Sequence, residues 1–499
     1  METSIFKKYL DSTERTDTIK CVGRVTKVQG LLIESRGPQA IIGEICRIIA
    51  PKGRGQIKAE VVGLRNEIVQ LMAFEETDGI EVGDRIVALG SRLEVPVSEK
   101  LMGRVLDALG NPIDDKGDIS SDCLYPALAS PPDPLKRRRV TERISTGVRA
   151  IDGLLAVGKG QRLGIFSGSG VGKSTLLGMI ARNTTADVNV VALIGERGRE
   201  VNDFIENDLG PEGLARSVLV VTPSNSSPLA RLRGAYVATA IAEYFRDQGK
   251  DVMLLFDSVT RFARAMREIG LASGEPPAQR GFPPSMFDSM PKLLERSGTS
   301  DKGSITGFYT VLVDGDDMDE PVADTVRGIL DGHIVLSRDL AQSYHYPAID
   351  VLQSISRLAP SVSGPASKMA AGEIRRTMAV YARAEDLINV GAYHQGSNPE
   401  IDYAITKHSQ IENFLIQDID EPSALEETLR FMSEITGVDI PEEEMADNNE
   451  KLLAAAGGVL KKIKPQKITA AAQLPAADSV MALNSVASLF SSLPAASAL

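Results

Sequence analysis

A glycine-rich turn between an apolar run and a helix-forming segment constrains this chain more than any other stretch. Residues 163–177 read LGIFSGSGVGKSTLL, so a short apolar strand breaks into a turn that ends in Lys173, Ser174 and Thr175. Glycines in such a turn let backbone N–H groups converge on phosphate oxygens, a lysine can reach the β- and γ-phosphates, and a hydroxyl can bind Mg²⁺. The stretch therefore predicts a phosphate-binding P-loop.

The P-loop pattern is incomplete at one position. The strict motif G-x-x-x-x-G-K-[ST] has glycine where this chain has Ser167, which affects the geometry of the turn and neither Lys173 nor Ser174. A glycine-rich turn that does not bind phosphate would not need a strand before it, a helix after it and a lysine at this position. We predict that seven consecutive residues bind nucleotide: Ser169, Gly170, Val171, Gly172, Lys173, Ser174 and Thr175.

Composition limits the classes of function. The 499 residues are enough for about two to four domains, and 43% are hydrophobic. A net charge of −12 argues against broad attraction to nucleic acid or acidic lipid, although a local basic patch is compatible with it. Three widely spaced cysteines suggest neither a disulfide framework nor a zinc site, and therefore a reducing compartment.

No segment of the sequence resembles a membrane-targeting element. Residues 1–20 lack the apolar core of a signal peptide, and no run approaches the about 18 apolar residues of a membrane span. We therefore expect a cytoplasmic protein that meets membranes only through partners. Residues 1–18 have apolar side chains at helical spacing, which predicts an amphipathic helix. It either docks a partner or packs on its own domain.

The remaining chain divides into four further segments by its pattern. Residues 19–95 contain short β-rich runs separated by glycine-bearing turns, as a small β-barrel requires. Residues 96–143 are a connector with a proline-rich end. In residues 144–360 apolar strands alternate with amphipathic helices, which predicts an α/β domain with a mainly parallel sheet. Residues 361–442 have a helical pattern, and residues 443–499 form an Ala/Ser/Leu-rich tail of weakly specified structure.

Six strands are expected in the α/β domain, at residues 163–167, 188–195, 218–222, 252–256, 305–313 and 334–337. Ligands of such sheets bind beyond the carboxyl ends of the strands. Asp257 ends one of these strands, as a Walker B carboxylate that belongs to the Mg²⁺ shell does; a helix-capping role is the alternative. Glu196 follows another strand and could polarise the attacking water. Glu200 competes for that role but suits the first turn of a helix better.

Three arginines are candidates for neutralising phosphate charge: Arg197, Arg261 and Arg357. A guanidinium is permanently charged and planar, although a structural ion pair is the more frequent role of a single arginine. Arg357 ends the α/β region, where a neighbouring subunit could present it as an arginine finger.

Several sequence blocks together resemble the flagellar and type III secretion export ATPases, which are related to the subunits of rotary ATP synthases. The blocks are FSGSGVGKS at 166–174, LIGERGREV at 193–201, GEPP at 274–277, GFPPS at 281–285, GDD at 315–317, ILDGHIVLSR at 329–338 and HYPAID at 345–350. The resemblance covers about residues 20–438 and implies an N-terminal β-barrel, a RecA-like P-loop NTPase core and a C-terminal helical domain. Ser167 occupies a position where these export ATPases commonly lack glycine.

The resemblance also implies roles for individual residues, with ATP and Mg²⁺ as ligands. Lys173 and Ser174 would hold phosphate and Mg²⁺, Glu196 would activate water, and Asp257 would belong to the metal shell. Arg197 and Arg261 would contact the γ-phosphate region. Tyr346 would stack on adenine; the alternative is an ordinary core aromatic.

Glu196 and Arg357 look present on one chain, whereas the synthases place the equivalent residues on different polypeptides. A homohexamer would then make every interface catalytic. The acidic stretch that engages the rotor of the synthases is not evident, since residues 389–400 read NVGAYHQGSNPE and match the export ATPases. Coupling to a proton-driven synthase is therefore not expected.

The function that the resemblance implies is ATP hydrolysis at a flagellar export apparatus, coupled to chaperone release, unfolding and export of substrate proteins. Expected partners are a peripheral-stalk regulator at the N-terminal helix, a central-stalk protein, the export gate, and export chaperones with their substrates. The expected location is the cytoplasmic side of the inner membrane. Alternatives are a virulence injectisome ATPase, a Rho-like nucleic-acid translocase and a non-catalytic nucleotide-binding scaffold subunit.

Overall fold

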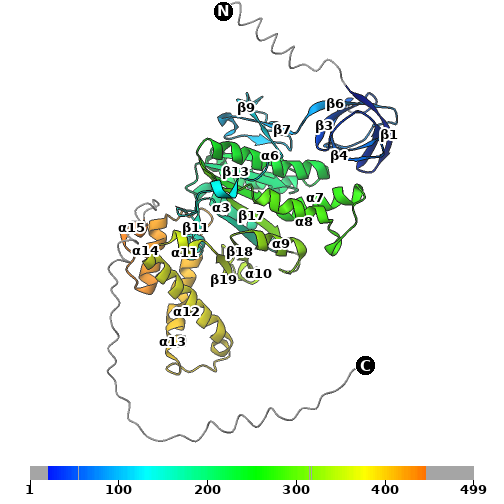
Figure 1. Ribbon diagram of the computed structural model, residues 1–499. Helices are drawn as coiled ribbons and strands as arrows, with labels where there is room; N and C mark the ends of the chain where they lie inside the picture. The colour runs from blue at the N-terminus through cyan, green and yellow to red at the C-terminus, as the bar shows by residue number, and fades with distance from the viewer. Residues whose placement is uncertain (1–20, 54, 314, 316, 446–499) are drawn as a thin grey trace, which may run out of the picture. The chain divides into compact units, whose positions relative to one another are not determined.

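The computed structural model describes residues 21–445, except residues 54, 314 and 316 (Figure 1). The predicted helix at 1–18 and residues 446–499 of the predicted tail lie outside the described residues. Within the described part, no helix is both long and apolar enough to cross a membrane.

Six antiparallel strands close into the predicted N-terminal β-barrel (Figure 1). Alternate side chains of these strands point inward, as in β1, and the interior is filled by Val25, Ile33, Ile48, Ile57 and Leu71. The strands are β1 (Val22–Gln29), β2 (Leu32–Arg36), β3 (Glu44–Ala50), β4 (Gly55–Arg65), β5 (Ile68–Ala73) and β6 (Arg85–Arg92), joined in the order β1-β2-β5-β4-β3-β6.

The central domain is built on a nine-stranded sheet in which most strands run parallel. Its order is β19-β18-β12-β17-β15-β13-β14-β8, and the short β16 (Gly298–Thr299) pairs with β17. The strands are β8 (Val105–Leu106), β12 (Arg162–Ser167), β13 (Val188–Ile194), β14 (Ser217–Thr222), β15 (Asp251–Asp257), β17 (Ser304–Leu312), β18 (Gly332–Leu336) and β19 (Ile349–Ser356). The six strands that the sequence predicts are all present in this sheet. β8 and the antiparallel β19 are additional edge strands.

Helices cover both faces of this sheet, so its central strands are buried on both sides. In β13, Val190 and Ala192 pack into one hydrophobic cluster, whereas Val191 and Leu193 pack into another. This arrangement explains the nearly continuous apolar sequence of the strand. The first cluster contains α6 (Pro228–Asp247), α7 (Val259–Ala272), α8 (Pro284–Leu294) and α9 (Pro321–Ile329); the second contains α2 (Arg149–Leu154) and α3 (Lys173–Asn183).

Short elements complete the central region. β7 (Glu94–Val97) and β9 (Cys123–Pro126) form a small sheet against α6, where the Tyr125 hydroxyl donates to Asp247 over 3.2 Å. The barrel contacts α6 as well, through the ion pair of Arg233 with the buried Glu60. The other elements are β10 (Arg143–Ile144), β11 (Val157–Gly158), α4 (Gly198–Asp203), a π-helical turn (Phe204–Leu209), α5 (Gly210–Ala215), α10 (Arg338–Gln342) and α11 (Ala359–Val362).

The C-terminal region is helical, as the sequence predicts. It contains α12 (Pro365–Asn389), α13 (Pro399–Leu415), α14 (Leu425–Thr436) and α15 (Glu442–Met445). Phe414, Leu429 and Met432 are buried in the cluster that also contains α2. At Gly153 of α2 a Cβ atom would lie 2.7 Å from Cζ of Phe414, so glycine permits this close packing.

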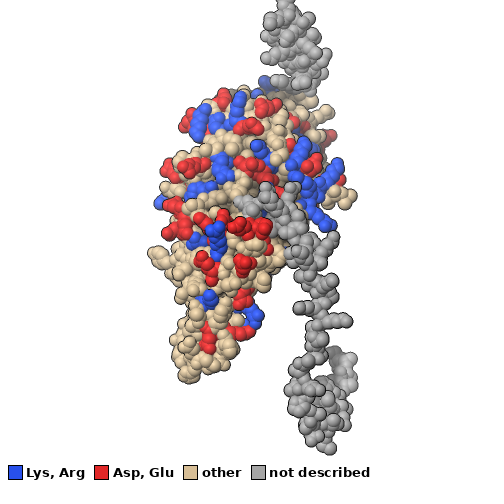
Figure 2. Space-filling view, turned by 90° about the vertical axis from the view of Figure 1, so that its left-hand side faces the viewer, with Lys and Arg blue, Asp and Glu red and all other residues tan. Residues whose placement is uncertain are grey.

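Charged side chains of both signs are interspersed over the face shown in Figure 2. The lower end of the molecule in this view, formed by α12 and α13, is mostly uncharged (Figures 1 and 2).

Candidate nucleotide-binding and catalytic site

The P-loop connects the end of β12 to the first residue of α3. Gly170 and Gly172 have φ values of 79° and 87°, a left-handed conformation that glycine adopts without a steric penalty. Val171 is buried and anchors the loop to the core, whereas Ser169 and Gly170 are exposed. The Oγ atom of Ser167 is buried and has no hydrogen-bond partner among the described residues. The loop thus leaves its tip open beside the amino terminus of an eleven-residue helix.

Charged side chains from the first residue of α3 and from the ends of the neighbouring strands β13 and β15 meet beside the P-loop. Lys173 forms an ion pair and hydrogen bond with Asp257, at the end of β15. The Nζ atom of Lys173 also lies 3.6 Å from Oε1 of Glu196, which follows β13. Parallel strands bring their carboxyl ends to one edge of the sheet, which explains why residues so far apart in sequence converge here.

Glu196 is buried within this cluster. Its Oε1 atom has no hydrogen-bond partner in the described part of the chain. Burial raises the pKa of Glu196 to about 7, the negative charge of Asp257 adds to the rise, and the positive charge of Lys173 opposes it. A carboxyl group with a pKa near neutrality and an oxygen that accepts no hydrogen bond from the described residues is suited to accept a proton.

Arg261 approaches Glu196 from α7. Its Nη2 atom lies 3.4 Å from Oε2 of Glu196. The side chain passes over Gly195, where φ is 73° and a Cβ atom would lie 3.0 Å from Cδ of Arg261. Glycine at position 195 therefore makes room for the arginine.

The structure also places Tyr346 next to the P-loop. A Cβ atom on Gly172 would lie 3.4 Å from Cε1 of the Tyr346 ring. The side chain is only partly covered, with an exposed fraction of 38% for the residue. Tyr346 is therefore a surface aromatic beside the loop and not an ordinary core residue.

Arg197 does not join the cluster. Its side chain is 76% exposed and pairs with Glu200, with 3.5 Å between Nη1 and Oε1. Glu200 lies in the first turn of α4, where the sequence suggests a stabilising interaction with the helix dipole.

Arg357 lies at the opposite end of the sheet from the P-loop of its own chain. Ser167 pairs with Leu336 at the end of β18, whereas Ser356 pairs with Gly332 at the beginning of β18. The backbone N–H of Arg357 donates to the carbonyl of Asp331 over 3.0 Å, and its side chain is exposed. The structure therefore does not bring Arg357 to the site within one subunit.

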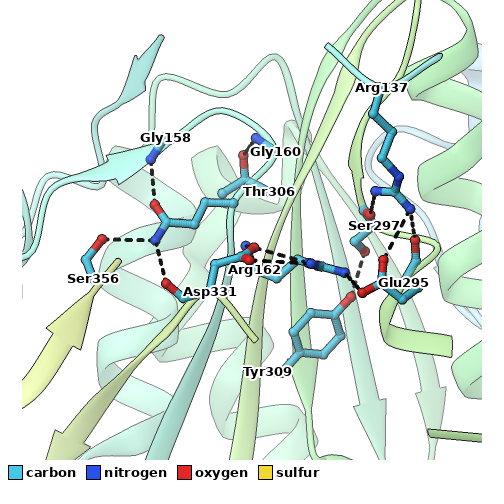
Figure 3. Close-up of polar contacts among 11 residues, drawn as sticks. Arg137, Gly158, Gly160, Arg162, Glu295, Ser297, Thr306, Tyr309, Asp331 and Ser356 are labelled. Atoms are coloured by element: carbon cyan, nitrogen blue, oxygen red, sulfur yellow. Dashed lines mark hydrogen bonds and ion pairs between the residues drawn. The ribbon is translucent and has the colours of Figure 1, made fainter. Parts of the chain in front are cut away.

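Asp331, whose carbonyl accepts from the backbone N–H of Arg357, belongs to the polar network that Figure 3 shows. Asp331 accepts hydrogen bonds from the backbone N–H and the guanidinium of Arg162, over 3.1 and 3.2 Å. Arg162 also pairs with Glu295, with 2.5 Å between Nη1 and Oε1, and Glu295 is shared with Arg137. This edge of the sheet is thus held by ion pairs from several elements.

Known proteins show the same domain organisation. The family model for the nucleotide-binding domain of the ATP synthase alpha/beta family matches residues 147–356 of this chain. The model of the β-barrel domain of the same family matches residues 25–90, and the T3SS EscN ATPase C-terminal domain matches residues 364–434. A "Flagellum-specific ATP synthase" of Treponema pallidum is 59% identical over 440 residues, which cover 88% of this chain and 98% of that protein.

The chain belongs to the ATP synthase alpha/beta family, among its flagellar and type III secretion ATPases. A flagellum-specific relative from Bacillus subtilis is 54% identical, covering 86% of this chain and 98% of the relative. A "Type 3 secretion system ATPase" from Xanthomonas euvesicatoria is 50% identical, covering 83% and 94%. The solved structure of the assembled EscN ATPase of enteropathogenic E. coli has a TM-score of 0.79 at 46% identity, covering 83% of this chain and 99% of that one.

The side chains and backbone groups at the P-loop are chemically suited to bind a nucleotide and its metal ion. The P-loop offers backbone N–H groups and Lys173, and Glu196 keeps an oxygen without a hydrogen-bond partner among the described residues. The Ser174 hydroxyl and the Asp257 carboxylate are hard oxygen donors of the kind that Mg²⁺ prefers. An ATPase of this family is thus expected to bind Mg-ATP here.

Sequence reasoning did not single out Thr310 of β17. Its hydroxyl donates to Oδ1 of Asp257 over 2.8 Å and so orients that carboxylate. β17 reads SITGFYTVL and contains several hydroxyl side chains, so Thr310 gave no distinct signal, and threonine is common in strands for reasons of packing.

Proposed function

We propose that this chain is the ATPase of a flagellar protein-export apparatus, which couples Mg-ATP hydrolysis to chaperone release, unfolding and export of substrate proteins. The observation that carries the proposal is the cluster of Lys173, Glu196, Asp257 and Arg261 at the carboxyl ends of the strands. Two of the relatives described above, at 59% and 54% identity, are named as flagellum-specific. The type 3 secretion relative at 50% identity makes an injectisome ATPase the second candidate.

The proposed chemistry depends on positioning and on neutralising charge. Glu196 orients the attacking water and accepts its proton, since its raised pKa places it near neutrality. Lys173 and Arg261 offset negative charge around the γ-phosphate. Ser174 and Asp257 would hold Mg²⁺, which would supply additional charge neutralisation when bound. Thr310 keeps the Asp257 carboxylate in place through its hydrogen bond.

Arg197 and Tyr346 have proposed roles at opposite ends of the nucleotide. Tyr346 stacks on adenine, which its position over Gly172 supports. Arg197 contacts the γ-phosphate region after leaving Glu200. That rearrangement is inexpensive, because an exposed ion pair contributes only about 0–1 kcal/mol.

We propose a homohexamer in which Arg357 completes the site of a neighbouring subunit. Its exposed position at the far edge of the sheet supports a role outside its own subunit. The solved EscN structures are described as assembled, and one of them as a complex with the central stalk EscO. A central-stalk partner is proposed here on that basis.

The other proposed partners follow from the family alone. They are a peripheral-stalk regulator at residues 1–18, the export gate, and export chaperones with their substrates. We propose that the protein works in the cytoplasm and reaches the inner membrane only through these partners, without nucleic acid.

The substitution Glu196→Gln tests the proposed function. We expect it to lower ATP turnover by about 100- to 10,000-fold, because the amide cannot accept the proton, while ATP still binds. Phosphate release and equilibrium binding of ATP measure the two effects. The matched control is Glu200→Gln, which changes the next carboxylate along the chain and should leave most activity. Normal turnover in Glu196→Gln, or equal loss in both variants, would assign the role to another residue.

A further inference from the structure

The loop that carries Tyr346 is held by the C-terminal helical region. Residues 343–348 connect α10 to β19, and Tyr346 is the member of this loop that reaches the P-loop. The Nδ1 atom of His345 lies 3.0 Å from Oε2 of Glu412, on α13. The backbone N–H of Gln417 donates to the carbonyl of Tyr346 over 2.9 Å. Two adjacent residues of the loop thus bond to one short segment, residues 412–417.

The hydrogen bond to Glu412 is the polar anchor of the His345 ring. His345 is 5% exposed, and its other ring nitrogen, Nε2, has no hydrogen-bond partner among the described residues. The same bond holds the pKa of Glu412 below its ordinary value. Loss of this contact would leave the buried ring without a hydrogen-bond partner among the described residues.

Gln417 connects the same segment to the beginning of the nucleotide-binding domain. Its side-chain amide donates to the carbonyl of Gly147 over 2.8 Å and accepts from the backbone N–H of Arg149 over 2.9 Å. Arg149 in turn donates to the carbonyl of Phe414 over 3.0 Å. Residues 412–417 are therefore bonded to the nucleotide-binding domain independently of residues 343–348, so they can hold that loop in place.

Close packing does not fix the loop on the side that faces the helices. A cavity of about 480 Å³ lies there, and His345, Glu412, Glu385, Tyr381 and His408 are among its lining residues. This cavity opens to the surface, so the loop has no continuous packing on this side. The bonds from Glu412 and Gln417 therefore hold the loop on this side, in addition to its backbone bonds to α10, such as that from the N–H of His345 to the carbonyl of Leu340 over 3.0 Å.

We infer that Glu412 is a positioning residue for nucleotide binding: through His345 it holds Tyr346 against the P-loop, so that the C-terminal helical region sets the affinity for the base. This inference rests on the proposed contact of Tyr346 with adenine. It predicts that loss of Glu412 weakens binding of the base and leaves binding of the phosphates unchanged.

The substitution Glu412→Ala in the full-length protein tests the inference. Since an aromatic stack changes affinity by at most about tenfold, we expect the KM for ATP to rise by about two- to tenfold with kcat nearly unchanged. Inhibition by inorganic tripolyphosphate, which has no base, should keep its wild-type constant. Glu412→Gln retains an oxygen acceptor and should restore most of the affinity. Glu385→Ala is the matched control, because it removes another glutamate beside the same cavity and should have no effect.

A double variant separates this inference from the proposed function. If Glu412 acts through Tyr346, adding Glu412→Ala to Tyr346→Ala should cause no further rise in KM. Additive effects, a parallel loss of tripolyphosphate inhibition, or an unchanged KM in Glu412→Ala would overturn the inference. If Tyr346→Ala itself left the KM for ATP unchanged, the proposed adenine contact would be wrong. Hydrolysis of ATP by the wild-type protein tests the proposed activity separately.

Discussion

At the scale of single residues, the site combines opposite charges whose balance sets the chemistry. Glu196 and Asp257 are carboxylates, and Lys173 contacts both of them. Burial and the negative charge of Asp257 raise the pKa of Glu196, and the positive charge of Lys173 opposes that rise. The two carboxylates therefore have separate proposed roles, one for the proton and one for the metal ion.

The pKa of Glu196 predicts how activity depends on pH. Because Glu196 must be ionised to accept a proton, kcat/KM should fall about tenfold per pH unit below its pKa of about 7. Steady-state hydrolysis between pH 5.5 and 8 measures this slope. Glu200→Gln should move the profile to lower pH, because the Glu200 side chain contributes to the raised pKa of Glu196. A flat profile down to pH 5.5 would contradict the prediction.

The raised pKa of Glu196 affects the stability of the fold in the opposite direction to activity, because it stabilises the folded protein at low pH. The folded-state pKa of Glu196 lies above its ordinary value of 4.5, so the folded protein holds this proton more tightly than the unfolded chain. The contribution is fully present below pH 4.5 and is lost as the pH rises to about 7. Activity therefore requires the ionised form, which is the less stable one.

Sequence patterns could place most of the site residues but could not give their contacts. Lys173, Glu196 and Asp257 follow apolar strands, and parallel topology brings such positions together. The exposure of Arg197 could not be predicted, since it depends on which way one side chain leaves the turn before α4. Thr310 was missed because its partner, Asp257, belongs to a neighbouring strand.

At the scale of secondary-structure elements, the loop after β13 requires a particular backbone. We predict that Gly195→Ala lowers the free energy of unfolding by about 1–3 kcal/mol, since alanine is strained at a φ of 73° and its Cβ would crowd Arg261. Thermal melting measures the stability, and kcat should also fall as Arg261 moves. In Gly198→Ala a Cβ atom would meet nothing within 4 Å, so this control should melt like the wild type. Equal melting temperatures for both variants would refute the argument.

The strands that the sequence could not predict are those at the edges of the sheet. β13 and β15 are mostly apolar because helices cover both of their faces. β19 is covered less completely and mixes buried with exposed residues, so it lacks that signal. β8 has only two residues, and it lies within the stretch that the sequence suggests is a connector. Its pairing with β14 depends on tertiary structure.

At the scale of the whole molecule, we propose that one chain carries both halves of a catalytic site, which its own fold keeps apart. Glu196 lies at the carboxyl ends of the parallel strands, and Arg357 lies at the opposite edge, beside Asp331. A ring of identical subunits would join the two edges at every interface.

Mixed rings test this claim most directly. Homogeneous preparations of Glu196→Gln and of Arg357→Ala should both be nearly inactive when assembled. In a ring formed from equal amounts of the two, about a quarter of the interfaces combine an intact Glu196 with an intact Arg357. We predict that mixing followed by reassembly restores ATP hydrolysis to a substantial fraction of the wild-type rate. A mixture that stays as inactive as either variant alone would contradict the account.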